Sequence, residues 1–93
     1  MTHINKGNPF PLGSSLTSQG VNFSLVATNA EYVEILLFEK EGSISPKSIL
    51  KLDQNHNTGP YWHAEVKNLN EGCFYAFRGD NIPVQNKKYF WKS

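Results

Sequence analysis

The sequence predicts an all-β fold, an immunoglobulin-like antiparallel β-sandwich in a single domain. Apolar and polar residues alternate with a period of two in five or six short segments, which is the pattern of half-buried strands. Turns rich in Gly, Pro, Asn and Ser separate these segments. No segment of ten or more residues carries the apolar period of a helix, so any helix should be a short turn. A length of 93 residues suits one domain.

The first two expected strands show the clearest alternation. In the first, the residues predicted to face inward are Val21, Phe23, Leu25 and Ala27, and those predicted to face outward are Asn22, Ser24 and Thr28. After a turn at residues 28–31, a strand at 32–38 turns Val33, Ile35 and Leu37 inward. Its outward face is unusually apolar for a solvated surface and carries Tyr32, Glu34, Leu36 and Phe38.

Three further strands are expected at residues 48–53, 61–66 and 73–78. Their inward residues by parity are Leu50, Leu52, Trp62, Ala64, Val66, Cys73, Tyr75 and Phe77. By the same parity His63 faces outward. Residues 53–60 form a long polar turn.

The chain therefore divides into three parts. Residues 1–20 have no sustained apolar period and several Gly and Pro residues, so we expect an irregular N-terminal segment that packs on the sandwich. Residues 21–80 form the sandwich module. Residues 81–93 lose the alternation, and they are expected to be a divergent tail or an edge strand.

Tyr75 has the leader of a tyrosine corner. Leu69, Gly72 and Tyr75 follow one another at intervals of three residues. In immunoglobulin-like sandwiches, a tyrosine at the entry of a late strand bonds to backbone a few residues upstream. The alternative is an ordinary half-buried strand tyrosine.

Composition excludes several classes of function. The net charge of +1 gives no electrostatic footprint for nucleic acid. The longest apolar stretch, Ile35 to Phe38, is far too short to span a membrane. The single cysteine, Cys73, excludes an internal disulfide, and the polar stretch from Met1 to Gly13 does not resemble a signal peptide. We therefore expect a cytoplasmic protein with no nucleic acid or membrane partner.

No catalytic, metal or cofactor site is expected. The sequence has no Gly-x-Ser-x-Gly elbow, and Cys73 is expected to pack in the core. The histidines His3, His56 and His63 are isolated in sequence, and each is interpreted as a surface histidine rather than a ligand. The eight acidic residues lie on predicted strand faces and turns.

Two kinds of surface remain as candidates. Sugar binding needs flat, exposed aromatic rings, for which we single out Tyr32, Tyr61 and Trp91. An interdomain surface needs outward apolar side chains, and the candidates for it are Leu36, Phe38 and Phe74.

An ordered series of motifs carries a family resemblance. The series begins with Gly-Asn-Pro-Phe-Pro-Leu-Gly at residues 7–13 and Gly-Val-Asn-Phe-Ser-Leu at 20–25. It continues with Val-Glu-Ile-Leu-Leu-Phe at 33–38, Tyr-Trp-His at 61–63, and Leu69, Gly72 and Tyr75 followed by Ala-Phe-Arg. In this order and spacing, residues 7–80 resemble the N-terminal domain of isoamylase-type debranching enzymes, which is grouped with the family 48 carbohydrate-binding modules.

The resemblance implies a non-catalytic module in front of a (β/α)-barrel that hydrolyses α-1,6 branch linkages in glycogen or starch. Such a barrel needs about 250 residues and is not within this chain. Relatives of the module that bind glycogen well stack two tryptophans on the glucan. Here the corresponding residues 39–43 and 79–83 contain no Trp, and residues 79–93 lack the motifs with which debranching enzymes continue.

We therefore rank three functions. The first is an accessory module that packs on the catalytic barrel of a debranching enzyme and shapes its substrate cleft. The second is a free-standing module that binds an α-glucan such as glycogen or starch. The third is a generic immunoglobulin-like domain that pairs an edge strand with a protein partner.

Overall fold

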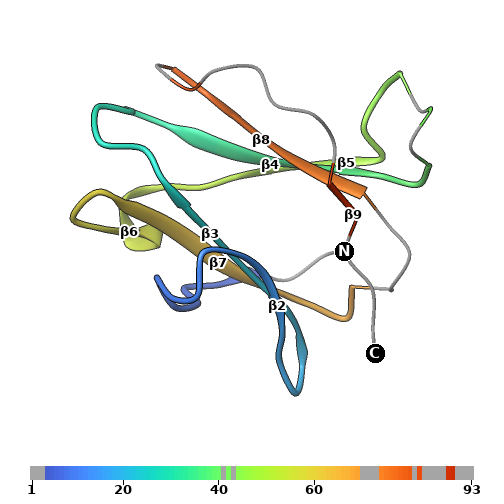
Figure 1. Cartoon of the computed structure of the whole chain (residues 1–93), viewed down its shortest axis with the longest axis horizontal. Helices are drawn as coiled ribbons and strands as arrows, with labels where there is room; N and C mark the ends of the chain where they lie inside the picture. The colour runs from blue at the N-terminus through green and yellow to red at the C-terminus, as the bar shows by residue number, and fades with distance from the viewer. Residues whose placement is uncertain are drawn as a thin grey trace.

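The computed structural model describes residues 4–40, 42, 44–69, 74–80, 82 and 88–89, the last two by their backbone alone. Two antiparallel sheets face each other as the layers of a sandwich (Figure 1). This arrangement confirms the predicted all-β sandwich. The only helix of the described residues is the 3₁₀ turn η1 (Gln54–His56), as the absence of a helical period requires.

The first sheet has five strands. In spatial order four of them are β1 (Ile4–Asn5), β7 (Tyr61–Lys67), β3 (Gly20–Val26) and β2 (Gly13–Leu16). The fifth, β6 (Asn57–Thr58), forms a hairpin with β7. Gly59 has a φ of 59° at the first loop position of this hairpin, where two-residue hairpin loops favour glycine.

The second sheet has four strands, in the order β5 (Ser48–Lys51), β4 (Val33–Phe38), β8 (Phe74–Gly79) and β9 (Lys88–Tyr89). The turn from β3 to β4 carries the chain between the layers. Asp80, directly after β8, secures this turn because its Oδ1 accepts hydrogen bonds from the amides of Glu31 and Tyr32, at 2.7 and 3.1 Å.

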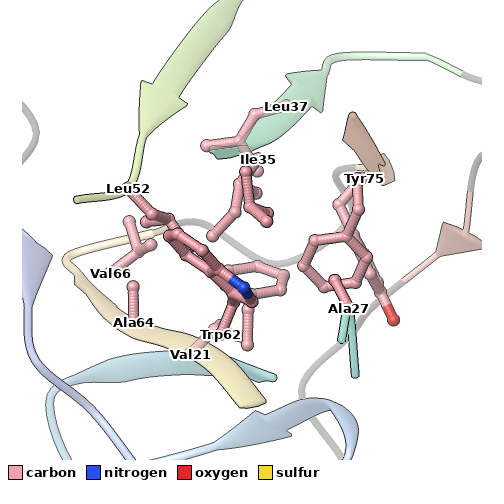
Figure 2. Packing of buried hydrophobic residues seen from close by; sticks show 12 residues of the cluster. Val21, Ala27, Ile35, Leu37, Leu52, Trp62, Ala64, Val66 and Tyr75 are labelled. Carbon is pink, nitrogen blue, oxygen red and sulfur yellow. The ribbon is translucent and has the colours of Figure 1, made fainter. Parts of the chain in front are cut away.

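The core lies between the two sheets and consists of the residues with the predicted inward parity. Figure 2 shows Trp62 of β7 packed among aliphatic side chains from both layers. The buried cluster is Val21, Phe23, Ala27, Val33, Ile35, Leu37, Leu52, Trp62, Ala64, Val66, Tyr75 and Phe77. Removal of this apolar surface from water is the main driving force for joining the sheets.

Tyr75 is a core residue. Its ring packs edge to face on Phe23, with the centroids 4.9 Å apart, and on Phe77 at 5.6 Å. The hydroxyl reaches Gly13 of the opposite sheet. A Cβ added to Gly13 would lie 3.8 Å from this hydroxyl oxygen. Gly72, the turn residue of the predicted tyrosine corner, lies outside the described residues, so the corner stays a prediction.

The N-terminal part of the chain is more regular than the sequence predicts. Within residues 4–20, expected to be irregular, β1 pairs with β7 and β2 pairs with β3. These strands have only two and four residues, too few to show an apolar period. Thr17 closes the β2–β3 turn, since its Oγ1 accepts a hydrogen bond from the amide of Gly20 at 2.9 Å.

The prediction of surface histidines is wrong for two of them. His63 is only 1% exposed, and His56 is also buried. His56 ends η1, where its Nδ1 accepts a hydrogen bond from the amide of Asp53 at 3.2 Å and lies 3.0 Å from the Asp53 carboxylate. His63 is buried because the N-terminal segment covers its side of the sheet. His3 lies outside the described residues.

Candidate functional site

The N-terminal arm, residues 6–12, lies across the outer face of β3 and β7, and buried polar side chains fasten it there. The Asn22 side chain makes two hydrogen bonds to the backbone of Asn8. Its Oδ1 accepts from the Asn8 amide at 2.8 Å, and its Nδ2 donates to the Asn8 carbonyl oxygen at 3.0 Å. The Ser24 hydroxyl donates to the Pro9 carbonyl oxygen at 2.6 Å. Asn22 and Ser24 were expected on a solvated face, but both are buried because the arm covers them.

His63 fastens the start of the arm. Its Nδ1 lies 2.7 Å from the carbonyl oxygen of Lys6, and its Nε2 lies 2.8 Å from the hydroxyl of Thr58. A carbonyl oxygen only accepts, so the neutral ring that satisfies both contacts carries its hydrogen on Nδ1 and accepts at Nε2. The ring therefore links the arm to strand β6.

Gly7 allows the arm to lie this close to the sheet. Its φ is 71°, a left-handed conformation that favours glycine. A Cβ at this position would lie 2.7 Å from backbone atoms of Ala64 and Glu65 and 2.6 Å from the Asn22 side chain. The glycine that opens the Gly-Asn-Pro-Phe-Pro-Leu-Gly motif is thus required by both backbone conformation and space.

The arm ends on an aromatic pair. The rings of Phe10 and Tyr61 meet edge to face, with centroids 4.8 Å apart and planes inclined by 61°. Phe10 is 60% exposed, and Val26, the cross-strand partner of Tyr61, is also exposed. We call Phe10, Tyr61 and Val26 the aromatic patch. It is an apolar surface on the outer face of the first sheet.

The three predicted sugar-binding residues do not form one site. Tyr61 is half-buried in the aromatic patch, on the first sheet. Tyr32 is 39% exposed, but it precedes β4 of the second sheet. No ring contact joins Tyr32 to Tyr61 within the described part of the chain. Trp91 lies outside the described residues, so its proposed role stays a prediction.

The predicted interdomain residues lie on the outer face of the second sheet, but they differ in exposure. Leu36 and Phe74 are half-buried. Phe38, expected to be a surface residue, is only 5% exposed, so its side chain is packed within the domain itself although its parity points outward. Phe38 and Phe74 are cross-strand partners on β4 and β8, which places them in one row of this face.

Ile49 extends this face toward the sheet edge. It is the cross-strand partner of Leu36 on β5 and is 49% exposed. The parity that placed Leu50 inward also places Ile49 outward, so the sequence contained the signal for it. We call Leu36, Ile49 and Phe74 the apolar sheet face. It is bordered by the ion pair of Arg78 and Glu34, whose Nε and Oε1 lie 2.8 Å apart.

The titratable side chains of the described residues do not form a metal site. Within residues 4–40, 42, 44–69, 74–80 and 82, no group of three His, Cys, Asp or Glu residues is placed to hold a metal ion. Hydrogen bonds from Thr17 and then Asn5 lower the pKa of Glu65 from its usual value; desolvation opposes them, and the charge of Lys67 adds a lesser lowering. A carboxyl group with a lowered pKa is ionised at neutral pH and does not suit a proton donor.

The same part of the chain shows no helix of the length and apolarity that crossing a bilayer demands. The features that remain are therefore the two surfaces, one on the outer side of each sheet. Of these, the apolar sheet face was largely anticipated. Phe10 and the buried polar contacts behind it were not, although Phe10 stands between two prolines in a motif that the sequence analysis singled out.

Comparison with known proteins identifies the kind of module. Residues 11–90 match the family described as carbohydrate-binding module 48 (isoamylase N-terminal domain). A glycogen debranching enzyme of Enterobacter sp. (strain 638) is 36% identical over 78 residues, covering 84% of this chain and 11% of that enzyme. Its counterpart in Klebsiella pneumoniae (strain 342) is 32% identical over 91 residues, which cover 96% of this chain and 13% of that enzyme. The chain thus spans only a small part of these relatives' length.

Solved structures show the same fold. The apo pullulanase of Paenibacillus barengoltzii superposes with a TM-score of 0.66 at 23% identity, over 80% of this chain and 11% of the pullulanase. The complex of that enzyme with maltohexaose and α-cyclodextrin gives the same TM-score at 24% identity. The match covers 77% of this chain and 11% of the pullulanase. At this level of identity the likeness supports the sandwich architecture alone.

Proposed function

The chain belongs to the carbohydrate-binding module 48 family, and we propose that it is the non-catalytic N-terminal accessory module of a cytoplasmic glycogen debranching enzyme. In this proposal, a separate catalytic barrel hydrolyses the α-1,6-glucosidic branch linkages. The module packs on that barrel and helps to shape the substrate cleft. It requires no cofactor for this role.

The apolar sheet face is the observation that carries the proposal. Ile49 and Leu36 are paired across adjacent strands, and Phe74 lies on the next strand along. Apolar side chains on the outer side of a sheet are typical of a surface that another domain covers. The Arg78–Glu34 pair at its border suits a polar rim around an apolar contact.

A chimeric enzyme tests this role. The chain replaces the matching N-terminal segment of the Enterobacter debranching enzyme, and the variants Ile49→Lys and Ile44→Lys are compared. Ile44 is 98% exposed and lies in the loop before β5, away from the apolar sheet face, so Ile44→Lys is the matched control. We expect Ile49→Lys to lower the thermal midpoint of the chimera and its activity on glycogen, while Ile44→Lys changes neither.

The isolated chain provides the second half of the test. Because Ile49 is half exposed, Ile49→Lys should change the stability of the 93-residue chain by only about 0.5 kcal/mol or less. A chimera that tolerates Ile49→Lys as well as Ile44→Lys would contradict packing through this face.

The second candidate function is glucan binding, and the aromatic patch favours it. Exposed rings are the usual platform for sugar rings, and Tyr61 was singled out for this purpose. The two functions use opposite faces of the sandwich, so one module can serve both.

A further inference from the structure

We propose that Phe10 and Tyr61 form a stacking site for a glucose unit of an α-glucan, on the side of the sandwich opposite the apolar sheet face. This inference rests on the proposed function, because it assumes a module that works beside a glucan-processing barrel. It adds a specific site on the first sheet and the residues that position that site.

The geometry of the two rings suits a pyranose. Their planes meet at 61° with the centroids 4.8 Å apart, so the pair presents an angled aromatic corner rather than a flat strip. Phe10 is 60% exposed, which leaves much of its surface open to the apolar C–H face of a sugar. The Tyr61 hydroxyl makes no hydrogen bond to another residue in the described part of the chain, and it can bond a sugar hydroxyl.

The neighbours of the pair along the chain and across the strands are uncharged. Along the arm, Phe10 is flanked by Pro9 and Pro11, and Tyr61 follows the Gly59–Pro60 loop of the β6–β7 hairpin. The cross-strand neighbour of Tyr61 is Val26 on one side and Thr58 on the other. A neutral ligand rich in hydroxyl groups matches this chemistry, whereas the apolar sheet face has an ionic border.

The backbone on both sides of Phe10 is held by contacts with β3. The residue before it, Pro9, is fixed by the buried hydroxyl of Ser24, and Asn8 is fixed by Asn22. Gly13, three residues later, begins β2 and pairs with the same Ser24. Burying polar side chains is costly unless they are hydrogen-bonded, and here the bonds are used to fix the backbone on both sides of Phe10.

Such anchoring lowers the entropic cost of binding. A ring on a loose arm would lose conformational freedom on contact with the sugar, while a ring on a fixed backbone has already lost it. Ser24 is therefore assigned as a positioning residue, which acts on the sugar through Phe10 rather than by contact.

Amide chemical shifts of the 93-residue chain during titration with maltohexaose test the site. We expect saturable shifts at residues 9–12, 25–27 and 58–61. Phe10→Ala should raise the dissociation constant for maltohexaose by about tenfold, which is the scale of one well-placed aromatic contact. Tyr32→Ala is the matched control, because it removes an exposed ring on the other sheet, and it should leave the constant unchanged.

Two further variants examine the parts of the site. Tyr61→Phe keeps the ring and removes the hydroxyl, so we expect a smaller loss of about two- to fivefold. Ser24→Ala should weaken binding without unfolding the sandwich, and Ser24→Thr should restore it because the hydroxyl returns. A purely structural role of Ser24 would predict no effect on the dissociation constant of the folded variant.

Each alternative outcome overturns the proposal in a recognisable way. Shifts grouped on Leu36, Ile49 and Phe74 would place the sugar on the other sheet. Equal affinity for cellohexaose would contradict an α-glucan ligand. No shift at millimolar maltohexaose would reject the glucan site, while the packing function would still be decided by the chimera with Ile49→Lys.

Discussion

The buried ring of His63 lies 2.7 Å from the carbonyl oxygen of Lys6 through its Nδ1, so a central strand of the first sheet holds a segment that is 57 residues away in sequence. The other ring nitrogen contacts Thr58 at 2.8 Å. One side chain thus connects the N-terminal arm, β7 and β6. The arm is part of the folded domain, and several consequences can be measured.

Replacing His63 by leucine should destabilise the chain. The apolar side chain leaves the Lys6 carbonyl and the Thr58 hydroxyl without their partner, at about 1–3 kcal/mol for each group that stays buried. Urea unfolding followed by circular dichroism measures the change. His63→Gln is the control, because it keeps one donor and one acceptor, and it should lose less. Equal stability of His63→Leu and the parent would show that the arm is not held by this ring.

Gly7→Ala and Gly59→Ala form a matched pair. Both glycines have a positive φ, 71° and 59°, so both alanines should cost about 1 kcal/mol of backbone strain. A Cβ at Gly59 meets nothing within 4 Å, while one at Gly7 would meet the backbone of β7 at 2.7 Å. We therefore expect Gly7→Ala to cost about 1–3 kcal/mol more than Gly59→Ala. Equal losses of unfolding free energy would contradict the close approach of the arm.

Titration of Glu65 should report its hydrogen bonds. The pKa of Glu65 is lowered chiefly by the Thr17 side chain and then by Asn5, and Thr17→Ala should raise it toward the ordinary value. The chemical shift of the Glu65 carboxyl carbon, followed against pH, measures the pKa of Glu65 in the parent and in Thr17→Ala. The variant Asn5→Ala should raise the pKa of Glu65 by a smaller amount. An unchanged pKa in Thr17→Ala would contradict the contact.

The lowered pKa of Glu65 also has a consequence for stability. A carboxyl group whose pKa is lower in the folded state contributes stability above its unfolded pKa, and this contribution is lost as pH falls through the folded pKa. Glu65→Gln removes that dependence, so its unfolding free energy should fall less steeply than that of the parent as the solution is acidified below about pH 4.5. If the unfolding free energies of Glu65→Gln and the parent fell equally steeply with pH, the pKa of Glu65 would not be lowered by folding.

Ile35→Ala and Ile49→Ala separate the inner and outer sides of the second sheet. Ile35 is fully buried between the layers, and its truncation should cost about 2–5 kcal/mol because it removes apolar contacts and leaves a cavity. Ile49 is half exposed on the outer side, and its truncation should change the stability by about 0.5 kcal/mol or less. Thermal or urea unfolding of the two variants compares them. A large loss from Ile49→Ala would mean that this face is covered within the chain.

Much of the sandwich could be predicted from the sequence because burial between two layers imposes a period of two. Val21, Phe23 and Trp62 turned inward as parity required. The same reasoning failed for Asn22, Ser24 and His63, since it assumed that the outward face of a strand meets water. Their partners lie in the arm, and no local pattern shows that a distant segment covers a strand.

The candidate surfaces divide in a similar way. Leu36 and Phe74 were found because outward apolar residues are visible in the alternation. Phe38 was assigned to the same surface, yet it is buried, because parity gives the side of a sheet and not the neighbours above it. Tyr61 was chosen as an exposed ring, but its partner Phe10 could only be found from coordinates.

By itself, the sequence determined the fold class, the inward residues of the main strands and the family of the chain. These depend on local periodicity and on ordered motifs, which are properties of neighbouring residues. Only the tertiary structure decided that residues 6–12 cover the first sheet, that His63, Asn22 and Ser24 are buried, and that Phe10 meets Tyr61. These depend on hydrogen bonds between the arm and strands 14 to 57 residues away. Such contacts form when the whole chain packs, because only then does burial make an unpaired polar group costly.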